Sequence, residues 1–157
     1  MSEKETPDGP QVATPPALYP ALGIGIAYFL QLYLPLYLPG SIALKAAAWC
    51  VFVLALLLIG WALTTLRKFK TTTLAYQASR YLVTTGPYRF SKNPMYLGFI
   101  LLMVASALAT ANAWILLSIA PTLWLLSVYT IGPEEDFLRK QFGSSYQNYS
   151  VKVRRWL

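Results

Sequence analysis

The sequence contains no histidine and only one cysteine, Cys50, which lies within a long apolar run. Histidine is the commonest general base and the commonest metal ligand at physiological pH, so its absence removes both roles at once. A single cysteine forms no disulfide framework and no cysteine-based metal site. P-loop, HExxH, CxxC and GxSxG patterns are also missing. We therefore expect no metal site, and nothing in the sequence indicates a soluble nucleotide, metal or triad enzyme.

Charge is scarce as well, because only 12% of the 157 residues are charged, against roughly a quarter in an ordinary soluble domain. No charged residue occurs in three long runs, at residues 9–44, 46–66 and 93–133. Each run is as long as the roughly 20 residues that an apolar helix needs to cross a bilayer, and the last has room for two. The sequence predicts an all-α integral membrane protein with about four transmembrane helices. We place the spans at about residues 17–38, 42–66, 94–108 and 113–131.

Both ends of the chain are too polar to span. Residues 1–16 are net acidic and rich in proline and threonine, which predicts a disordered tail rather than a signal peptide with its basic beginning. Residues 17–157 then form a single membrane-embedded domain. Within it, residues 132–157 form an amphipathic helical tail, because Pro133 and the acids at 134–136 mark a helix start with negative charge at the positive end of the helix dipole.

Positive charge predicts the orientation. The loop after the second span and the tail at 132–157 together hold eleven of the thirteen basic residues, and the turn between the third and fourth spans holds none. By the positive-inside rule the loop, the tail and, with four spans, both termini are cytoplasmic. The chain has a net charge of +7, and most of its basic residues lie beside the membrane, where anionic lipid headgroups account for them. We therefore expect the bilayer and no nucleic acid as partner.

The chain returns to the membrane through a polar, basic loop. Gly86-Pro87 indicates a turn, and Asn93-Pro94 indicates a helix start with Asn93 as N-cap and Pro94 as first helical residue. Taken singly, these features need no function beyond a cap and an interfacial aromatic belt. No Asp, Glu, Arg or His lies within a predicted span, where transporters usually carry such residues, so a transporter or other non-enzymatic membrane protein is the weaker alternative.

Two separated motifs, taken together, resemble a known family. The run LVTTGPYRFSKNPMYLG is followed by EExxLxxxFGxxYxxY, from Glu134 to Tyr149, and by a basic V-x-R-W. This order is similar to that of isoprenylcysteine carboxyl methyltransferases, whose wider group includes membrane phospholipid methyltransferases. The resemblance covers roughly residues 71–157. It implies S-adenosylmethionine as cofactor, bound at the cytoplasmic ends of the last two spans, and a lipophilic or amphipathic acceptor that arrives from the bilayer. The cofactor-binding positions that it implies are Tyr81, Leu82, Val83, Tyr88, Asn93, Pro94, Met95, Tyr96 and Glu134.

The sequence departs from the family pattern at two places. The common Arg-His-Pro is Lys92-Asn93-Pro94 here, although asparagine still caps and hydrogen-bonds. The eukaryotic members carry a substrate-binding arginine just before the Glu-Glu motif, whereas residues 129–133 contain none. The acceptor therefore stays open among a carboxylate, an amine such as a phospholipid headgroup, and a small thiol.

Methyl transfer from a sulfonium needs alignment and desolvation more than proton transfer. A carboxylate is already ionised at neutral pH, but an amine must first lose a proton, so a chain without histidine fits a carboxylate or thiolate slightly better. By the resemblance, Glu134 pairs with the cofactor's ammonium group or ribose, and Tyr88 and Tyr96 wall the cofactor. We name Arg89 and Glu135 as catalytic candidates, Arg89 because guanidinium pairs well with a carboxylate.

Overall fold

The computed structural model describes residues 14–69 and 81–156, and the regular elements in these ranges are all helical. This agrees with the all-α part of the predicted fold class. Residues 1–13 of the predicted tail, and residues 70–80 of the loop, lie outside the described residues. The elements are α1 (Leu18–Tyr33), α2 (Ile42–Lys68), the 3-10 turn η1 (Gly86–Arg89), α3 (Pro94–Thr110), α4 (Ala113–Leu126), the π-helical turn η2 (Ser127–Ile131), α5 (Gly132–Phe142) and α6 (Ser144–Lys152).

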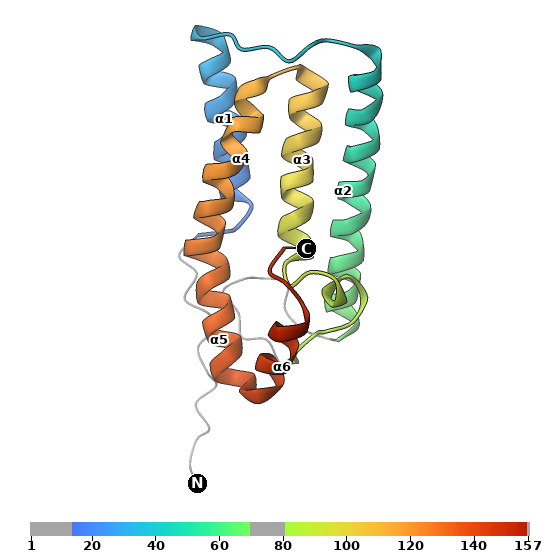
Figure 1. Ribbon diagram of the computed structural model, residues 1–157, viewed down its shortest axis with the longest axis vertical. Helices are drawn as coiled ribbons and strands as arrows, with labels where there is room; N and C mark the ends of the chain where they lie inside the picture. Colours follow the sequence, from blue (N-terminus) through green and yellow to red (C-terminus); the bar gives the residue numbers. More distant parts are fainter. Residues whose placement is uncertain (1–13, 70–80, 157) are drawn as a thin grey trace.

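The four helices α1 to α4 lie side by side along the long axis of the molecule (Figure 1). In the bundle α1 packs against α4, α4 against α3, and α3 against α2. Small residues allow close approach, since a Cβ at Gly98 of α3 would overlap the side chain of Ile59 on α2. Met103 and Ile115 are fully buried between the helices. The bundle thus holds together through close backbone packing around a small apolar core.

Two helices in the described residues are long and apolar enough to cross a membrane. They are α2 and the continuous helix Ala113–Phe142, which comprises α4, η2 and α5. The other two predicted spans are apolar helices of 16 and 17 residues, α1 and α3. Large apolar side chains such as Ile42, Leu57 and Trp49 are exposed on α2. An exposed apolar surface of this kind is typical of contact with lipid.

The first predicted span is too long at its end, because α1 stops at Tyr33 and not near Leu38. Leu34 precedes Pro35 and leaves the helical region, with φ −133° and ψ 71°, as the clash with the proline ring favours. The chain then runs without helix until Ser41, whose hydroxyl accepts a hydrogen bond from the Leu44 N–H at 3.1 Å and so caps α2.

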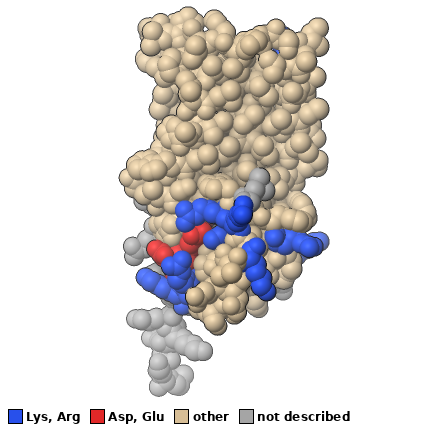
Figure 2. Space-filling model, in the orientation of Figure 1, with Lys and Arg blue, Asp and Glu red and all other residues tan. Residues whose placement is uncertain are grey.

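Charged residues gather at the end of the molecule where η1, α5 and α6 lie, and the rest of the face in view is almost free of them (Figure 2). The start of α2, whose first turn contains Lys45, lies at the opposite end (Figure 1). This distribution agrees with a loop and a tail on the same side of the membrane. That this side is cytoplasmic stays a prediction.

Candidate functional site

The two neighbouring acids of α5 face different partners. Successive helical residues point about 100° apart, so Glu134 and Glu135 cannot share one environment. The Glu134 Oε1 atom accepts a hydrogen bond from the Tyr96 hydroxyl at 2.7 Å, across 38 residues of sequence. Tyr96 is buried, with 4% of its surface exposed. This bond joins the start of α3 to the start of α5, and therefore joins the two motifs that the sequence singled out.

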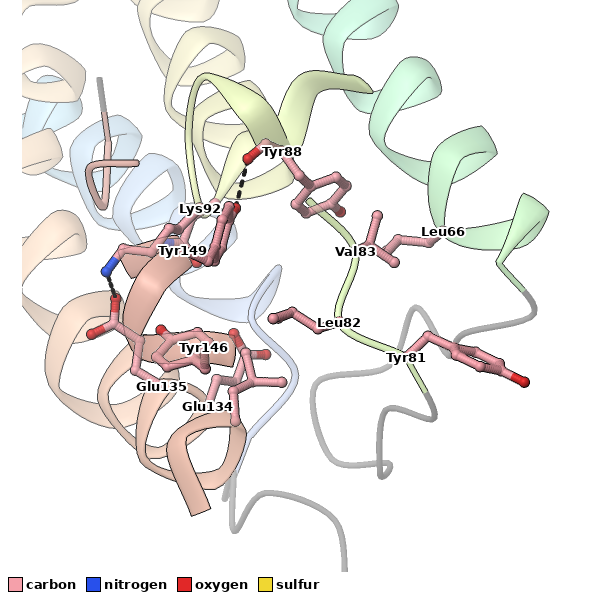
Figure 3. A pocket seen from close by; sticks show the side chains of 12 residues that line it. Leu66, Tyr81, Leu82, Val83, Tyr88, Lys92, Glu134, Glu135, Tyr146 and Tyr149 are labelled. Carbon is pink, nitrogen blue, oxygen red and sulfur yellow. Dashed lines mark hydrogen bonds and ion pairs between the residues drawn. The ribbon is translucent and has the colours of Figure 1, made fainter. Parts of the chain in front are cut away.

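A pocket with a cavity of about 100 Å³ opens beside Glu134. Its walls come from the end of α2, the loop before α3, and helices α5 and α6, and Figure 3 shows their side chains converging. One part of the wall is apolar and another carries carboxylates, an ammonium group and phenols. The lining residues are Leu66, Tyr81, Leu82, Val83, Tyr88, Lys92, Asn93, Glu134, Glu135, Leu138, Tyr146 and Tyr149.

Two tyrosines of the pocket connect the loop to α6. The Tyr149 hydroxyl donates a hydrogen bond to the Tyr88 carbonyl at 2.6 Å (Figure 3). Burial, followed by the nearby Glu134 carboxylate and Tyr149, raises the pKa of the Tyr88 phenol. Burial, followed by the neighbouring Tyr146, raises the pKa of the Tyr149 phenol. Both phenols are therefore protonated at neutral pH, where they serve as hydrogen-bond donors and not as bases.

Glu135 is held by two cations. Its Oε1 atom lies 3.0 Å from the Lys92 Nζ atom and accepts a hydrogen bond from Arg155 Nε at 3.2 Å. Its Oε2 atom accepts a second bond from Arg155 Nη2 at 2.7 Å. The Glu135 side chain is only 11% exposed. Because both oxygens are engaged, this geometry suits a residue that holds structure, and it does not favour the predicted catalytic role.

Asn93 occupies the predicted N-cap position, but its side chain makes no capping hydrogen bond. The predicted side-chain cap is therefore wrong. The Asn93 Nδ2 group instead donates to the Arg155 carbonyl at 3.0 Å, because the segment after α6 passes directly beside it. Pro94 is the first residue of α3, as predicted.

Four of the predicted site residues do not line the pocket. Arg89 is exposed, with its guanidinium carbon 5.1 Å from the centre of the Phe90 ring. Pro94 is buried and Met95 packs against the apolar core. Tyr96 acts on the pocket only through Glu134. The predicted positions Tyr81, Leu82, Val83, Tyr88, Asn93, Glu134 and Glu135 do line it.

The pocket also contains residues that were not predicted. Leu138, Tyr146 and Tyr149 are letters of the EExxLxxxFGxxYxxY pattern, and the spacing of three puts the two tyrosines on one face of α6, so the pattern could have identified them. Lys92 lies within the first motif but was read only as a departure from the family. Leu66 carries no sequence signal, because only the packing of α2 against η1 brings it to the site.

The sequence model for phospholipid methyltransferases matches residues 44–145, which is well over half of the chain. The chain belongs to the phospholipid methyltransferase family. Members of this family are S-adenosylmethionine-dependent methyltransferases. The match includes the pocket-lining residues from Leu66 to Leu138 and stops short of Tyr146.

Curated relatives match the chain over about half of its length. A probable protein-S-isoprenylcysteine O-methyltransferase of Oryza sativa subsp. indica is 33% identical over 82 residues, which cover 52% of this chain and 43% of the rice protein. The protein-S-isoprenylcysteine O-methyltransferase A of Arabidopsis thaliana is 32% identical over 78 residues, or 50% and 40% of the two chains. The Schizosaccharomyces pombe protein-S-isoprenylcysteine O-methyltransferase is 33% identical over 72 residues, or 46% and 30%. The chain thus spans less than half the length of these three relatives.

Proposed function

We propose that the protein is an integral membrane methyltransferase that uses S-adenosylmethionine to methylate a lipophilic or amphipathic acceptor. The observation that carries the proposal is the Glu134 carboxylate, which faces a pocket at one end of an apolar bundle and is held there by Tyr96. Both residues belong to the motifs that resemble the family, and the family match includes both. A buried carboxylate beside a cavity is a group to which a cationic ligand can bind favourably.

The residues of the pocket fit this cofactor chemically. Glu134 would hold the ammonium group of the cofactor, the phenol of Tyr88 would donate hydrogen bonds, and the apolar side chains of Leu82 and Val83 would lie against the adenine. The volume of about 100 Å³ is smaller than the 300–1,000 Å³ or so of a typical ligand pocket. Binding therefore requires the walls to move apart.

When bound, the cofactor supplies a methyl group activated on a positively charged sulfonium. The chain itself binds the two reactants, orients them and excludes water from them, which is what an in-line displacement needs. Glu135 is engaged by cations and Glu134 is assigned to the cofactor, so neither carboxylate is left as a base for an amine. A carboxylate or thiolate acceptor therefore suits the site better. Methylation of a phospholipid amine is the second candidate, because the matching family is described as phospholipid methyltransferases.

We further propose that all four helices cross the membrane with the pocket at the cytoplasmic surface. At about 1.5 Å per residue, the 17 residues of α3 span roughly 25 Å, somewhat less than the hydrocarbon core of about 30 Å. Local thinning of the bilayer accommodates such a difference at modest cost. The charged end of the bundle (Figure 2) then lies among cytoplasmic headgroups.

Calorimetric titration of the detergent-solubilised protein with S-adenosylhomocysteine tests the proposal. We expect saturable binding to the wild type. Glu134→Gln keeps the shape but removes the charge, and loss of a charge-assisted hydrogen bond of about 1.5–3 kcal/mol weakens binding roughly 10- to 150-fold. Asp136→Asn is the matched control, because this nearby side chain on α5 is 68% exposed, and it should bind like the wild type. Absence of binding by the wild type would refute the cofactor assignment and favour a non-enzymatic membrane protein.

A further inference from the structure

The segment after α6 connects two parts of the site that are distant in sequence. The Arg155 carbonyl accepts hydrogen bonds from Asn93 Nδ2 at 3.0 Å and from the Ser91 hydroxyl at 3.3 Å. One residue earlier, the Arg154 carbonyl accepts from the Lys92 N–H at 3.0 Å. The backbone of this segment is therefore fixed to the loop that leads into α3.

The side chain of Arg155 is fixed to α5. Its Nη2 and Nε atoms donate to the two oxygens of Glu135 at 2.7 and 3.2 Å. Paired donors of this kind set the direction of the carboxylate as well as its position, whereas the Lys92 ammonium group, which also contacts Glu135, is a point charge that leaves direction free. Arg155 thus contacts the loop with its backbone and α5 with its guanidinium group.

The start of α5 needs such an anchor because a π-helical turn, η2, separates it from α4. A π turn inserts an extra residue into the helical repeat, so the direction in which α5 presents its side chains is not fixed by the regular repeat of α4. Two side-chain hydrogen-bonded contacts hold that direction here, Tyr96 with Glu134 and Arg155 with Glu135, and the Lys92 ammonium group adds its charge at Glu135. When Glu134 binds a cation, the Tyr96 contact is shared with the ligand, and the Arg155 contact remains.

We propose that Arg155 is a positioning residue that holds the start of α5 against the loop before α3 and so aims Glu134 into the pocket. The identity of the ligand that Glu134 binds rests on the proposed function. The contact of Arg155 with α5 does not depend on that function. Arg155 touches neither Glu134 nor the pocket cavity in the described structure. Its effect on ligand binding is therefore transmitted through Glu135.

The test measures two quantities on the full chain in detergent. The affinity for S-adenosylhomocysteine, measured by titration, reports whether Glu134 is placed to bind the ligand. The rate of hydrogen exchange of the α5 amides reports directly how firmly α5 is anchored. We expect Arg155→Ala to weaken binding about 10- to 100-fold, because a displaced Glu134 loses a hydrogen bond to a charged ligand group. We also expect it to speed exchange in α5 but not in α2. Arg155→Lys should recover part of both losses, because it restores charge without the paired geometry. Arg154→Ala is the matched control, since that exposed side chain has no partner among the described residues.

The outcomes separate the two proposals. If Arg155→Ala binds the ligand like Arg154→Ala and leaves α5 exchange unchanged, the positioning role is overturned even though the wild type binds. If it only lowers thermal stability, with unchanged affinity well below the melting temperature, Arg155 is merely structural and the inference is again overturned. In a Glu135→Ala background, where both acceptor oxygens of this contact are gone, Arg155→Ala should weaken binding no further. A wild type that fails to bind refutes the proposed function, and α5 exchange then still decides whether Arg155 anchors the helix.

Discussion

Removing the Tyr96 hydroxyl is the sharpest perturbation of the site geometry. The Tyr96→Phe substitution keeps the ring but leaves the Glu134 carboxylate without the hydrogen bond at 2.7 Å that joins α3 to α5. Tyr96 is only 4% exposed, so water reaches the position of the missing donor only from the pocket beside Glu134. The free energy of unfolding should therefore fall.

The size of the loss follows from the character of the bond. Burial raises the pKa of the Glu134 carboxyl group to about 7, so the measurement is made at a pH of about 8.5, where this group is charged and a hydrogen bond to it contributes about 1.5–3 kcal/mol. Because the donor is buried and the bond is short, Tyr96→Phe should lie in the upper half of that range, at about 2–3 kcal/mol. In the background of Glu134→Ala, where the acceptor is already gone, the same substitution should cost less than about 1 kcal/mol, because two residues in direct contact are not additive.

Denaturant unfolding in detergent, followed by circular dichroism, measures these differences. Tyr129→Phe is the matched control, because this ring is 49% exposed and its hydroxyl has no hydrogen bond in the described structure, and it should change stability by less than about 0.5 kcal/mol. If Tyr96→Phe behaves like Tyr129→Phe, the buried contact that organises the site does not exist in solution. Equal effects in the wild-type and Glu134→Ala backgrounds would refute the pairing as well.

Further predictions concern packing and helix starts, and all are read by the same unfolding measurement. Gly98→Ala should cost about 1–3 kcal/mol through overlap with Ile59, whereas Gly60→Ala, with open space around its Cβ position, should stabilise by up to about 1 kcal/mol; equal effects would contradict the close helix contact. Asn112→Ala should cost about 1–2 kcal/mol, because its side chain caps α4 and is 1% exposed, and a neutral result would contradict this cap. Ser41→Ala should cost about 0.5–2 kcal/mol and Ser41→Gly only a few tenths, so the same loss in both would show that the α2 cap is not the cause.

Local sequence signals predicted the helix boundaries that depend on backbone chemistry. Proline at the first helical position predicted the start of α3 at Pro94. A proline also ended α1 early, but the predicted span ran past Pro35 because the apolar run continued. The π turn before α5 has no comparable signal. Its register is seen in the Gly132 N–H, which bonds to the Ser127 carbonyl five residues back, and apolar periodicity does not encode this change of register.

Only those site residues that belong to sequence motifs could be predicted. The family resemblance predicted that Glu134 and Tyr96 lie in one site, and the hydrogen bond between them agrees with this prediction. It could not assign the partner of Asn93, because that partner is a backbone carbonyl, and a carbonyl carries no sequence signal. It assigned Glu134 to the cofactor and Glu135 to catalysis, but it could not predict that Lys92 and Arg155 engage Glu135, since that depends on which side of α5 faces these cations.

Transfer of a tritiated methyl group from S-adenosylmethionine tests the central claim most directly. Membranes that contain the wild-type protein, membranes with the Glu134→Ala variant at equal protein level, and membranes without the protein would be incubated and separated into lipid, protein and small-molecule fractions. We predict that label enters one of these fractions in wild-type membranes only. Label at the same level in all three membranes would contradict the methyltransferase assignment.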